Sequence, residues 1–311
     1  MFEQRAPLVW RRRALTAAVS AVTATVSAVT AATVGLVGAT PAAAGEPAAV
    51  NCEANPAALR IAITGAAAGE ILEVSGTCTG PFVITRNLTL IGAEDAVLDG
   101  NFAGSTVSVG GAGVRVRLDN LTIINGTGTV VNNQIFGGGI LNNTGATVAL
   151  TDSTLRNNAA EFGGGIADLA VGGGAVTMDH SLLRDNTASF SGGAVFVGQQ
   201  STFSATHSLL RDNTAAHGGA VLTDAGGRVT LSDSAARDNS VSSDGGGIST
   251  LTGSTLTLIR SFVEGNHASN GPGSGGGILN VAGTVTLTQS TVRDNHPDNC
   301  APPGSVVGCI G

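Results

Sequence analysis

The sequence predicts an all-β fold: a right-handed parallel β-helix of about seven coils with a short N-terminal capping helix. The first observation behind this prediction is a repeat whose length stays between 26 and 29 residues. It is counted between serines that hold the same place in successive copies, namely Ser153, Ser181, Ser208, Ser234, Ser261 and Ser290. Such a fixed short period indicates a stack of similar units, each of which contacts its neighbours.

The second observation is the alternation inside each repeat. Apolar residues stand five and three positions before each serine, and Thr or Ser usually stands between them, as in Val176, Thr177 and Met178. A period of two predicts a strand with one buried and one solvated face. The third observation is that Gly and Asn separate these strands, where a coil must turn sharply. We therefore expect coils of three short strands without a helix.

Other repeat folds fit this pattern poorly. A propeller blade needs about 40 residues or more per repeat. A leucine-rich repeat would show a Leu-x-x-Leu-x-Leu frame, which these copies lack. The β-helix is the repeat fold that remains.

The first 44 residues are predicted to be a cleavable export signal. Arg11, Arg12 and Arg13 precede an uncharged Ala/Val/Thr-rich segment, and small residues end at Ala44. The alternative is an uncleaved anchor, because the apolar run is long enough to span a bilayer. Its many Thr and Ser residues favour cleavage, so we expect no membrane span in the mature chain.

Charge argues against a nucleic-acid partner. The chain has no Lys, and removing residues 1–44 takes away four Arg and one Glu. The mature chain then carries 21 acidic and 11 basic residues. An acidic chain without basic clusters suits neither phosphate backbones nor anionic membranes.

Each end of the mature chain is expected to carry a cap tied by a local disulfide. Residues 45–80 are predicted to be the N-terminal cap, 81–299 the β-helix and 300–311 the C-terminal cap. In the first cap, Asn55 precedes Pro56 at the start of a short amphipathic helix. The long solenoid between the two cysteine pairs favours Cys52–Cys78 and Cys300–Cys309. Four cysteines also fit an oxidising, extracellular compartment.

A second motif between the serines, Gly-Gly-(Gly/Ala)-(Ile/Val), is followed by Leu-x-x-Asn in Leu183–Asn186 and Leu210–Asn213. Over residues 81–299 these motifs resemble the Gly-Gly-Ala-Ile and Phe-x-x-Asn repeats of the polymorphic outer-membrane protein family. The resemblance implies a β-helix at a surface or outside the cell, often with an adhesive role. We expect the passenger part alone, because the eleven residues after Cys300 leave no room for that family's membrane barrel.

Two columns of residues are expected to stack along the rod. The first is interpreted as a structural Asn ladder rather than a binding stripe, because nearly every coil has one: Asn125, Asn158, Asn186, Asn213, Asn239, Asn266 and Asn295. The second is a solvated row of Arg beside Asp, in which Glu264 takes the place of one Arg. An outward Thr/Ser row also suggests ice binding, although it is single and interrupted.

No catalytic residue and no cofactor are assigned. The non-repeating acids are scattered through loops: Glu94, Asp95, Asp99, Glu161, Asp168, Asp224 and Asp244. One column departs from uniformity, and its members Asp152, His180, His207 and Asp233 are weak candidates for a metal site. A solvent-facing corner is the favoured interpretation, and we expect no metal.

These features favour a secreted, non-catalytic β-helix with a structural, adhesive or surface-binding role. Its partner would be a glycan or a surface protein, which the sequence does not identify. The mature chain has neither Tyr nor Trp for sugar stacking. The alternative is a polysaccharide lyase or glycoside hydrolase of the pectate-lyase-like superfamily, which requires carboxylates that converge in one cleft.

Overall fold

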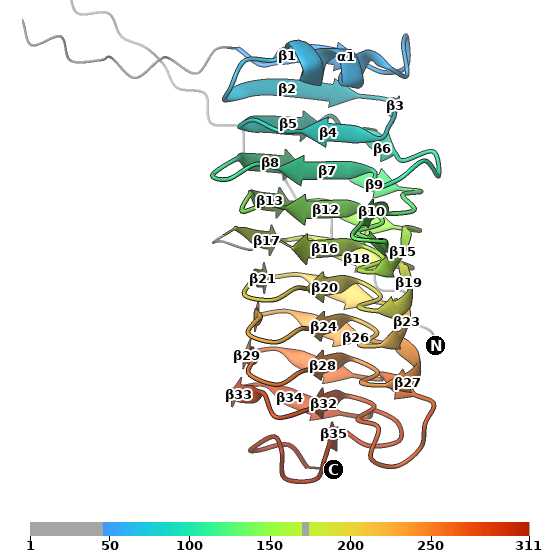
Figure 1. Cartoon of the computed structure of the whole chain (residues 1–311), viewed down its shortest axis with the longest axis vertical. Helices are drawn as coiled ribbons and strands as arrows, with labels where there is room; N and C mark the ends of the chain where they lie inside the picture. The colour runs from blue at the N-terminus through green and yellow to red at the C-terminus, as the bar shows by residue number, and fades with distance from the viewer. Residues whose placement is uncertain (1–45, 170–173, 311) are drawn as a thin grey trace, which may run out of the picture. The chain divides into compact units, whose positions relative to one another are not determined.

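The computed structural model describes residues 46–169 and 174–310, and these form one parallel β-helix (Figure 1). The predicted signal, residues 1–44, lies outside the described residues. The coils follow one another from the N-terminal end, blue in Figure 1, to the C-terminal end, red. Each regular coil has four strands, which belong in chain order to four sheets that we call A, B, D and C.

Sheet A contains the alternating strands that the sequence predicts. In spatial order it comprises β1 (Ala48–Asn51), β2 (Glu70–Ser75), β5 (Leu88–Gly92), β8 (Arg115–Asp119), β13 (Thr147–Thr151), β17 (Ala175–Asp179), β21 (Thr202–Thr206), β25 (Arg228–Ser232), β29 (Thr255–Ile259) and β33 (Thr284–Thr288). The register pairs Val176 with Phe203 and Thr177 with Ser204. The apolar residues of the strands therefore stack inside, and the Thr/Ser row stacks outside.

Sheet B follows sheet A in each coil and contains the Leu-x-x-Asn motif. It comprises β3 (Thr77–Thr79), β6 (Val97–Asp99), β9 (Thr122–Ile124), β14 (Thr154–Arg156), β18 (Leu182–Arg184), β22 (Leu209–Arg211), β26 (Ala235–Arg237), β30 (Phe262–Glu264) and β34 (Thr291–Arg293). The central residue of each strand is buried, and Leu183 and Leu210 are fully so. These residues close the main core from this side.

Sheet C follows the Gly-Gly motif and completes the main core. It comprises β4 (Phe82–Ile84), β7 (Val107–Gly110), β12 (Ile140–Asn143), β16 (Ile166–Leu169), β20 (Val195–Val197), β24 (Val221–Thr223), β28 (Ile248–Thr250), β32 (Ile278–Asn280) and β35 (Cys300–Ala301). Its first residues, such as Ile166 and Val195, are fully buried. Its second residues point outward, yet Leu141, Ala167, Phe196 and Leu222 are at least 93% buried. Another element therefore covers this outer face.

Sheet D is that element, and the sequence did not predict it. It comprises β10 (Thr129–Val131), β11 (Gln134–Phe136), β15 (Ala159–Phe162), β19 (Thr187–Ser191), β23 (Thr214–His217), β27 (Ser240–Asp244) and β31 (His267–Ala268). β10 and β11 form an antiparallel hairpin, whereas the other paired strands of this sheet are parallel. Its strands are short and rich in small residues, so their alternation is weak. Four residues of these strands form a small buried apolar cluster, separate from the main core: Ala188, Ala215, Val241 and Ala268.

The stack has about nine coils rather than about seven, because sheets B and C each contain nine strands. The additional strands lie at both ends, because β1, β2 and β3 fall within residues 45–80 and β35 falls within residues 300–311. These strands lack the repeat motifs of the other coils, so the sequence repeat does not reveal them. The N-terminal cap and the first coil are therefore the same segment.

The capping helix is α1 (Ala58–Gly65), which packs on the first coil through Leu59 and Ile63. It begins two residues after Pro56, and its N-cap is Ala57, without a side-chain cap. Asn55 instead accepts a hydrogen bond from the backbone N–H of Ala57 in the preceding turn. Both predicted disulfides, Cys52–Cys78 and Cys300–Cys309, are formed.

Candidate functional site

The Asn column lies inside the solenoid. From Asn158 to Asn295, each side-chain Nδ2 donates to Oδ1 of the Asn in the next coil over 2.9–3.0 Å. The backbone N–H of each Asn donates to the same oxygen. Asn299 ends the ladder by accepting from Asn295 over 3.1 Å. With both polar ends of the amides engaged, this column supports the fold and offers no open binding surface.

Asn125 does not belong to this ladder. The register pairs Arg156 with Ile124, so Gly126 holds the ladder position, and its N–H donates to Asn158 Oδ1. Asn125 lies one residue earlier, with a positive φ of 58°, and donates to Asp99 Oδ1 over 3.1 Å. Asn and Asp tolerate this left-handed conformation, so the turn accepts either residue type at that position.

The Arg row is neutralised by carboxylates on the surface. Arg184 and Arg211 each pair with the Asp that follows them. Glu264, which breaks the Arg row in the sequence, bridges Arg237 and Arg293 from the coils on either side. Four of the five Arg residues of the row, Arg184, Arg211, Arg237 and Arg293, are therefore paired with carboxylates.

The irregular column Asp152, His180, His207 and Asp233 lies at the corner between sheets A and B. The imidazole rings of His180 and His207 stack with centroids 4.6 Å apart. Asp233 is instead held by Arg260 of the next coil, which donates from Nε and Nη2 over 2.7 and 2.6 Å. That hydrogen-bonded pair lowers the pKa of Asp233 and raises the pKa of Arg260. Asp152 is an exposed residue of this column.

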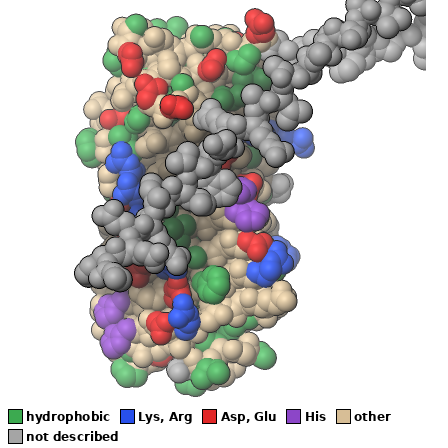
Figure 2. Space-filling model, turned by 180° about the vertical axis from the view of Figure 1, so that it is seen from behind, with side chains coloured by type: hydrophobic (Ala, Val, Ile, Leu, Met, Phe, Trp, Pro, Cys, Tyr) green, Lys and Arg blue, Asp and Glu red, His purple; other side chains and the backbone are tan. Residues whose placement is uncertain are grey.

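A carboxylate that the sequence did not single out joins the two histidines. Asp179 Oδ2 lies 3.0 Å from His180 Nδ1, and Asp179 Oδ1 lies 3.4 Å from His207 Nδ1. Partial desolvation raises the pKa of Asp179, but hydrogen bonds from both imidazoles outweigh it and leave that pKa below its usual value. Histidines gather at two places on the face in Figure 2, one of them beside carboxylates and an arginine.

The non-repeating acids have different surroundings. Asp168 is fully buried, and Asn142 Nδ2 donates to it over 2.9 Å. Glu161 accepts from the backbone of the β10–β11 hairpin over 2.7 Å. Asp244 lies on sheet D, and Asp224 lies on the loop after β24. Of the seven acids, Asp224 is the one that lines a groove beside sheet C.

This groove of about 700 Å³ runs along the solenoid between the outer face of sheet C and the overhanging ends of the sheet D strands. Its lining begins at Val131 in the hairpin and extends to Leu279 in β32. Six coils contribute, and with about 4.8 Å per layer the groove is about 24 Å long. Solenoids commonly bind ligands along such extended surfaces.

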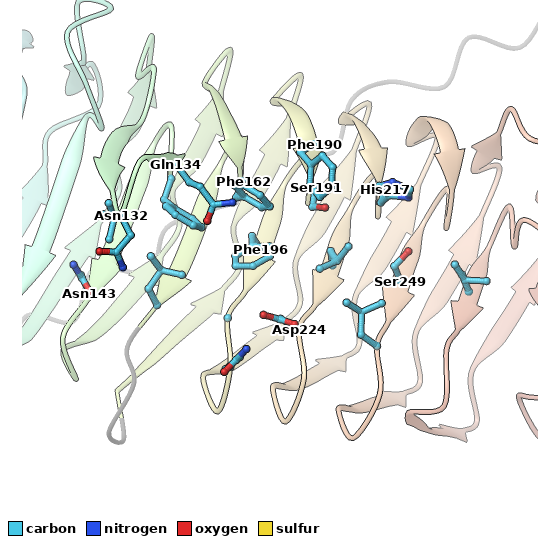
Figure 3. A pocket seen from close by; sticks show the side chains of 18 residues that line it. Asn132, Gln134, Asn143, Phe162, Phe190, Ser191, Phe196, His217, Asp224 and Ser249 are labelled. Atoms are coloured by element: carbon cyan, nitrogen blue, oxygen red, sulfur yellow. The ribbon is translucent and has the colours of Figure 1, made fainter.

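A continuous aromatic run forms the wall and floor of the groove. Phe136 stacks on Phe162 with ring centroids 5.0 Å apart, and Phe162 lies 5.2 Å from Phe190 and 5.3 Å from Phe196. Phe190 then meets His217 edge to face at 5.6 Å. Figure 3 shows Phe162, Phe190 and His217 in one row, with Phe196 and Asp224 on the other side of the groove.

Phe190 is the most accessible ring of this run, with 52% of its surface exposed. It lies in β19, which has one residue more than β15 or β23, and the pairing of these strands shifts register there. Such a bulge reorients side chains and is common beside binding sites. Here it adds a ring to the rim of the groove without disturbing the core.

The sequence contains a signal for this wall in the residue that precedes each Gly-Gly motif. The residue before each Gly-Gly motif changes from coil to coil, and the register aligns Phe136, Phe162, Ser191, His217 and Asp244 in one column. A position whose residue type changes from coil to coil is not required for the coils to stack. Four of the nine Phe residues of the chain gather at this groove.

The fold and the groove define a class of protein, a parallel β-helix with a lateral aromatic groove. No family model, no curated protein and no solved structure matches the chain. The resemblance to the polymorphic outer-membrane protein family therefore rests on the repeat motifs alone. Within residues 46–169 and 174–310, no helix is long and apolar enough to cross a membrane.

Proposed function

We propose that this chain is a secreted, non-catalytic β-helix that binds a neutral glycan chain in the aromatic groove and so attaches to a glycan-bearing surface. The observation that carries the proposal is the aromatic run from Phe136 to His217. Two disulfides in the described chain suit an extracellular protein. The resemblance of the repeats to surface-exposed β-helices points the same way.

The shape of the groove suits an elongated ligand. It is open along its length and follows the stacking direction over six coils, so a chain can lie in it without threading. Phe190, which is half exposed, offers an apolar ring face for the C–H face of a sugar ring, and the partly buried Phe162 lies beside it. The whole chain contains no Tyr, and its described residues include no Trp. Phe residues therefore supply the stacking surface.

The charge of the groove favours an uncharged ligand. No Arg lines it, and its titratable side chains are Asp224 and His217. A polyuronate would bring one carboxylate per sugar to a site without a cation, in a chain of net negative charge. Neutral hydroxyl groups instead match the amide side chains of Asn132, Gln134 and Gln199, which both donate and accept hydrogen bonds.

Binding is tested by affinity electrophoresis and calorimetry with soluble neutral polysaccharides (a β-glucan, a galactan and a xylan) and with polygalacturonate. We expect binding to at least one neutral polymer and none to polygalacturonate. The variant Phe190→Ala should weaken that binding about tenfold or more, because the most exposed ring of the groove is lost.

The matched control is Phe262→Ala, which removes a ring that is 45% exposed in β30, away from the groove. This variant should bind as the wild type does. The proposal fails if no neutral polymer binds, or if the two Phe variants lose affinity equally.

One observation favours an enzyme as the second candidate. Asp224 and His217 both line the groove, so a carboxylate and an imidazole are available for general acid–base chemistry on a bound glycan. A two-carboxylate glycosidase needs a second acid in the same groove. The polymers are therefore also assayed for new reducing ends. Cleavage that disappears in Asp224→Asn would replace the binding proposal by a glycoside hydrolase.

A further inference from the structure

We propose that Asp179, His180 and His207 form a binding site for a divalent transition-metal ion such as Zn²⁺, independent of the groove. The three residues come from two coils. Asp179 ends β17, His180 follows it at the corner, and His207 holds the same corner position one coil later. Each offers one ligand atom, and the three atoms lie within 4.8 Å of one another.

The potential ligand atoms lie near the spacing that a tetrahedral ion requires. Asp179 Oδ2 lies 3.0 Å from His180 Nδ1, and Asp179 Oδ1 lies 3.4 Å from His207 Nδ1. Bonds of about 2.0–2.1 Å in tetrahedral geometry place ligand atoms about 3.3 Å apart. A small adjustment of the three side chains therefore suffices to seat an ion. The fourth position faces solvent, because all three side chains are about half exposed.

The backbone holds both histidines in place before any ion arrives. His180 and His207 have positive φ angles of 46° and 47°, as do the other residues of their column. Their N–H groups donate to the carbonyls of Thr206 and Ser232 in the next coil, each over 3.1 Å. The serines that follow, Ser181 and Ser208, are buried in a hydrogen-bonded ladder. Because the backbone at both histidines is already fixed, binding of an ion would require ordering of the side chains alone.

The neighbouring residues confine the site to one place in the column. In the coils before and after Asp179, the register places Thr151 and Thr206 at its position. Asp233, one coil beyond His207, is tied by two hydrogen bonds to Arg260. Two imidazole nitrogens and a single carboxylate select Zn²⁺, Cu²⁺ or Ni²⁺ over Ca²⁺ and Mg²⁺, which prefer oxygen ligands.

The test is isothermal calorimetry of the purified, tag-free protein with ZnCl₂, and with CaCl₂ for comparison. We expect one Zn²⁺ per chain and no response to Ca²⁺. The variant His180→Gln should weaken Zn²⁺ binding about tenfold or more, and so should His207→Gln. Gln is tolerated at this corner, because Gln289 holds the same position with a φ of 51°. Asp179→Thr reproduces the neighbouring coils and should weaken binding likewise.

The control is the second histidine stack, His267 and His296, whose rings lie 5.0 Å apart. His267→Gln should leave Zn²⁺ affinity and stoichiometry unchanged. The proposal is overturned if the wild type does not bind Zn²⁺, or if Zn²⁺ binding survives in a well-folded double variant His180→Gln/His207→Gln. Circular dichroism and the thermal midpoint establish folding for each variant.

Discussion

The side chain of Asn186 donates through Nδ2 to Oδ1 of Asn213, one coil further along, over 3.0 Å, and both residues are fully buried. Asn213 repeats the same contact with Asn239, and its Nδ2 also donates to the carbonyl of Leu183. Each amide thus supports the coils on both sides. In such a stack the stability of each coil includes the contacts with its two neighbours.

Replacing Asn213 by Ala should destabilise the protein by about 3 kcal/mol. The substitution leaves the side-chain and backbone N–H of Asn186 without an acceptor in a buried place, and an unpaired buried polar group costs about 1–3 kcal/mol. Urea unfolding followed by circular dichroism measures the change. Asn295→Ala, at the half-buried end of the ladder, should cost clearly less. Equal losses would show that the ladder contributes no more inside than at its end.

The Gly-Gly motif should tolerate no side chain at its second glycine. A Cβ on Gly193 would lie 2.4 Å from the carbonyl oxygen of Gly219 in the next coil, which is backbone and cannot move aside. We expect Gly193→Ala to cost about 3 kcal/mol, or to prevent folding. Gly65→Ala is the control, because a Cβ there meets nothing within 4 Å. Its thermal midpoint should stay at or slightly above that of the wild type.

The Asp233–Arg260 pair should lose its contribution to stability only in acid. The hydrogen bonds from Arg260 lower the pKa of Asp233 below the ordinary value of 3.8 for this carboxyl group. The contribution is therefore complete above that value, and it is lost as the pH falls through the lowered pKa of the folded state. The thermal midpoints of the wild type and Arg260→Gln are compared from pH 7 to pH 2.5. Their difference should be constant down to about pH 5 and shrink below 3.8, and a difference that grows in acid would contradict this assignment.

The disulfide between Cys52 and Cys78 should secure the first coil. Both cysteines are buried against α1 and the first strands, and they lie 26 positions apart in the sequence. Cys52→Ala/Cys78→Ala should lower the free energy of unfolding by about 2–4 kcal/mol. Hydrogen exchange should show earlier opening of β1 and β2 than of the central coils. Unchanged protection there would mean that packing alone holds the cap.

The repeat predicted much of the fold because stacking imposes the same requirements on every coil. Leu183 and Leu210 must fill one core, and Asn186 and Asn213 must continue one ladder, so these requirements recur in the sequence at a fixed spacing. The coil count was too low because β1, β2 and β3 at one end and β35 at the other continue the stack without the repeat motifs. Asn125 was misassigned by one residue, because only the register shows that Gly126 holds the ladder position.

The sequence by itself determined the β-helix, the two disulfide pairs and the stacking of His180 on His207, since each follows from local spacing. The tertiary structure decided what lies beside these features. Asp179 joins the histidines because its strand ends at their corner, and Phe136, Phe162, Phe190 and Phe196 meet because sheet D folds over sheet C. A periodic pattern reveals which residues stack along the rod. Contacts across the rod depend on how the coil is bent in cross-section, which packing among all four sheets determines.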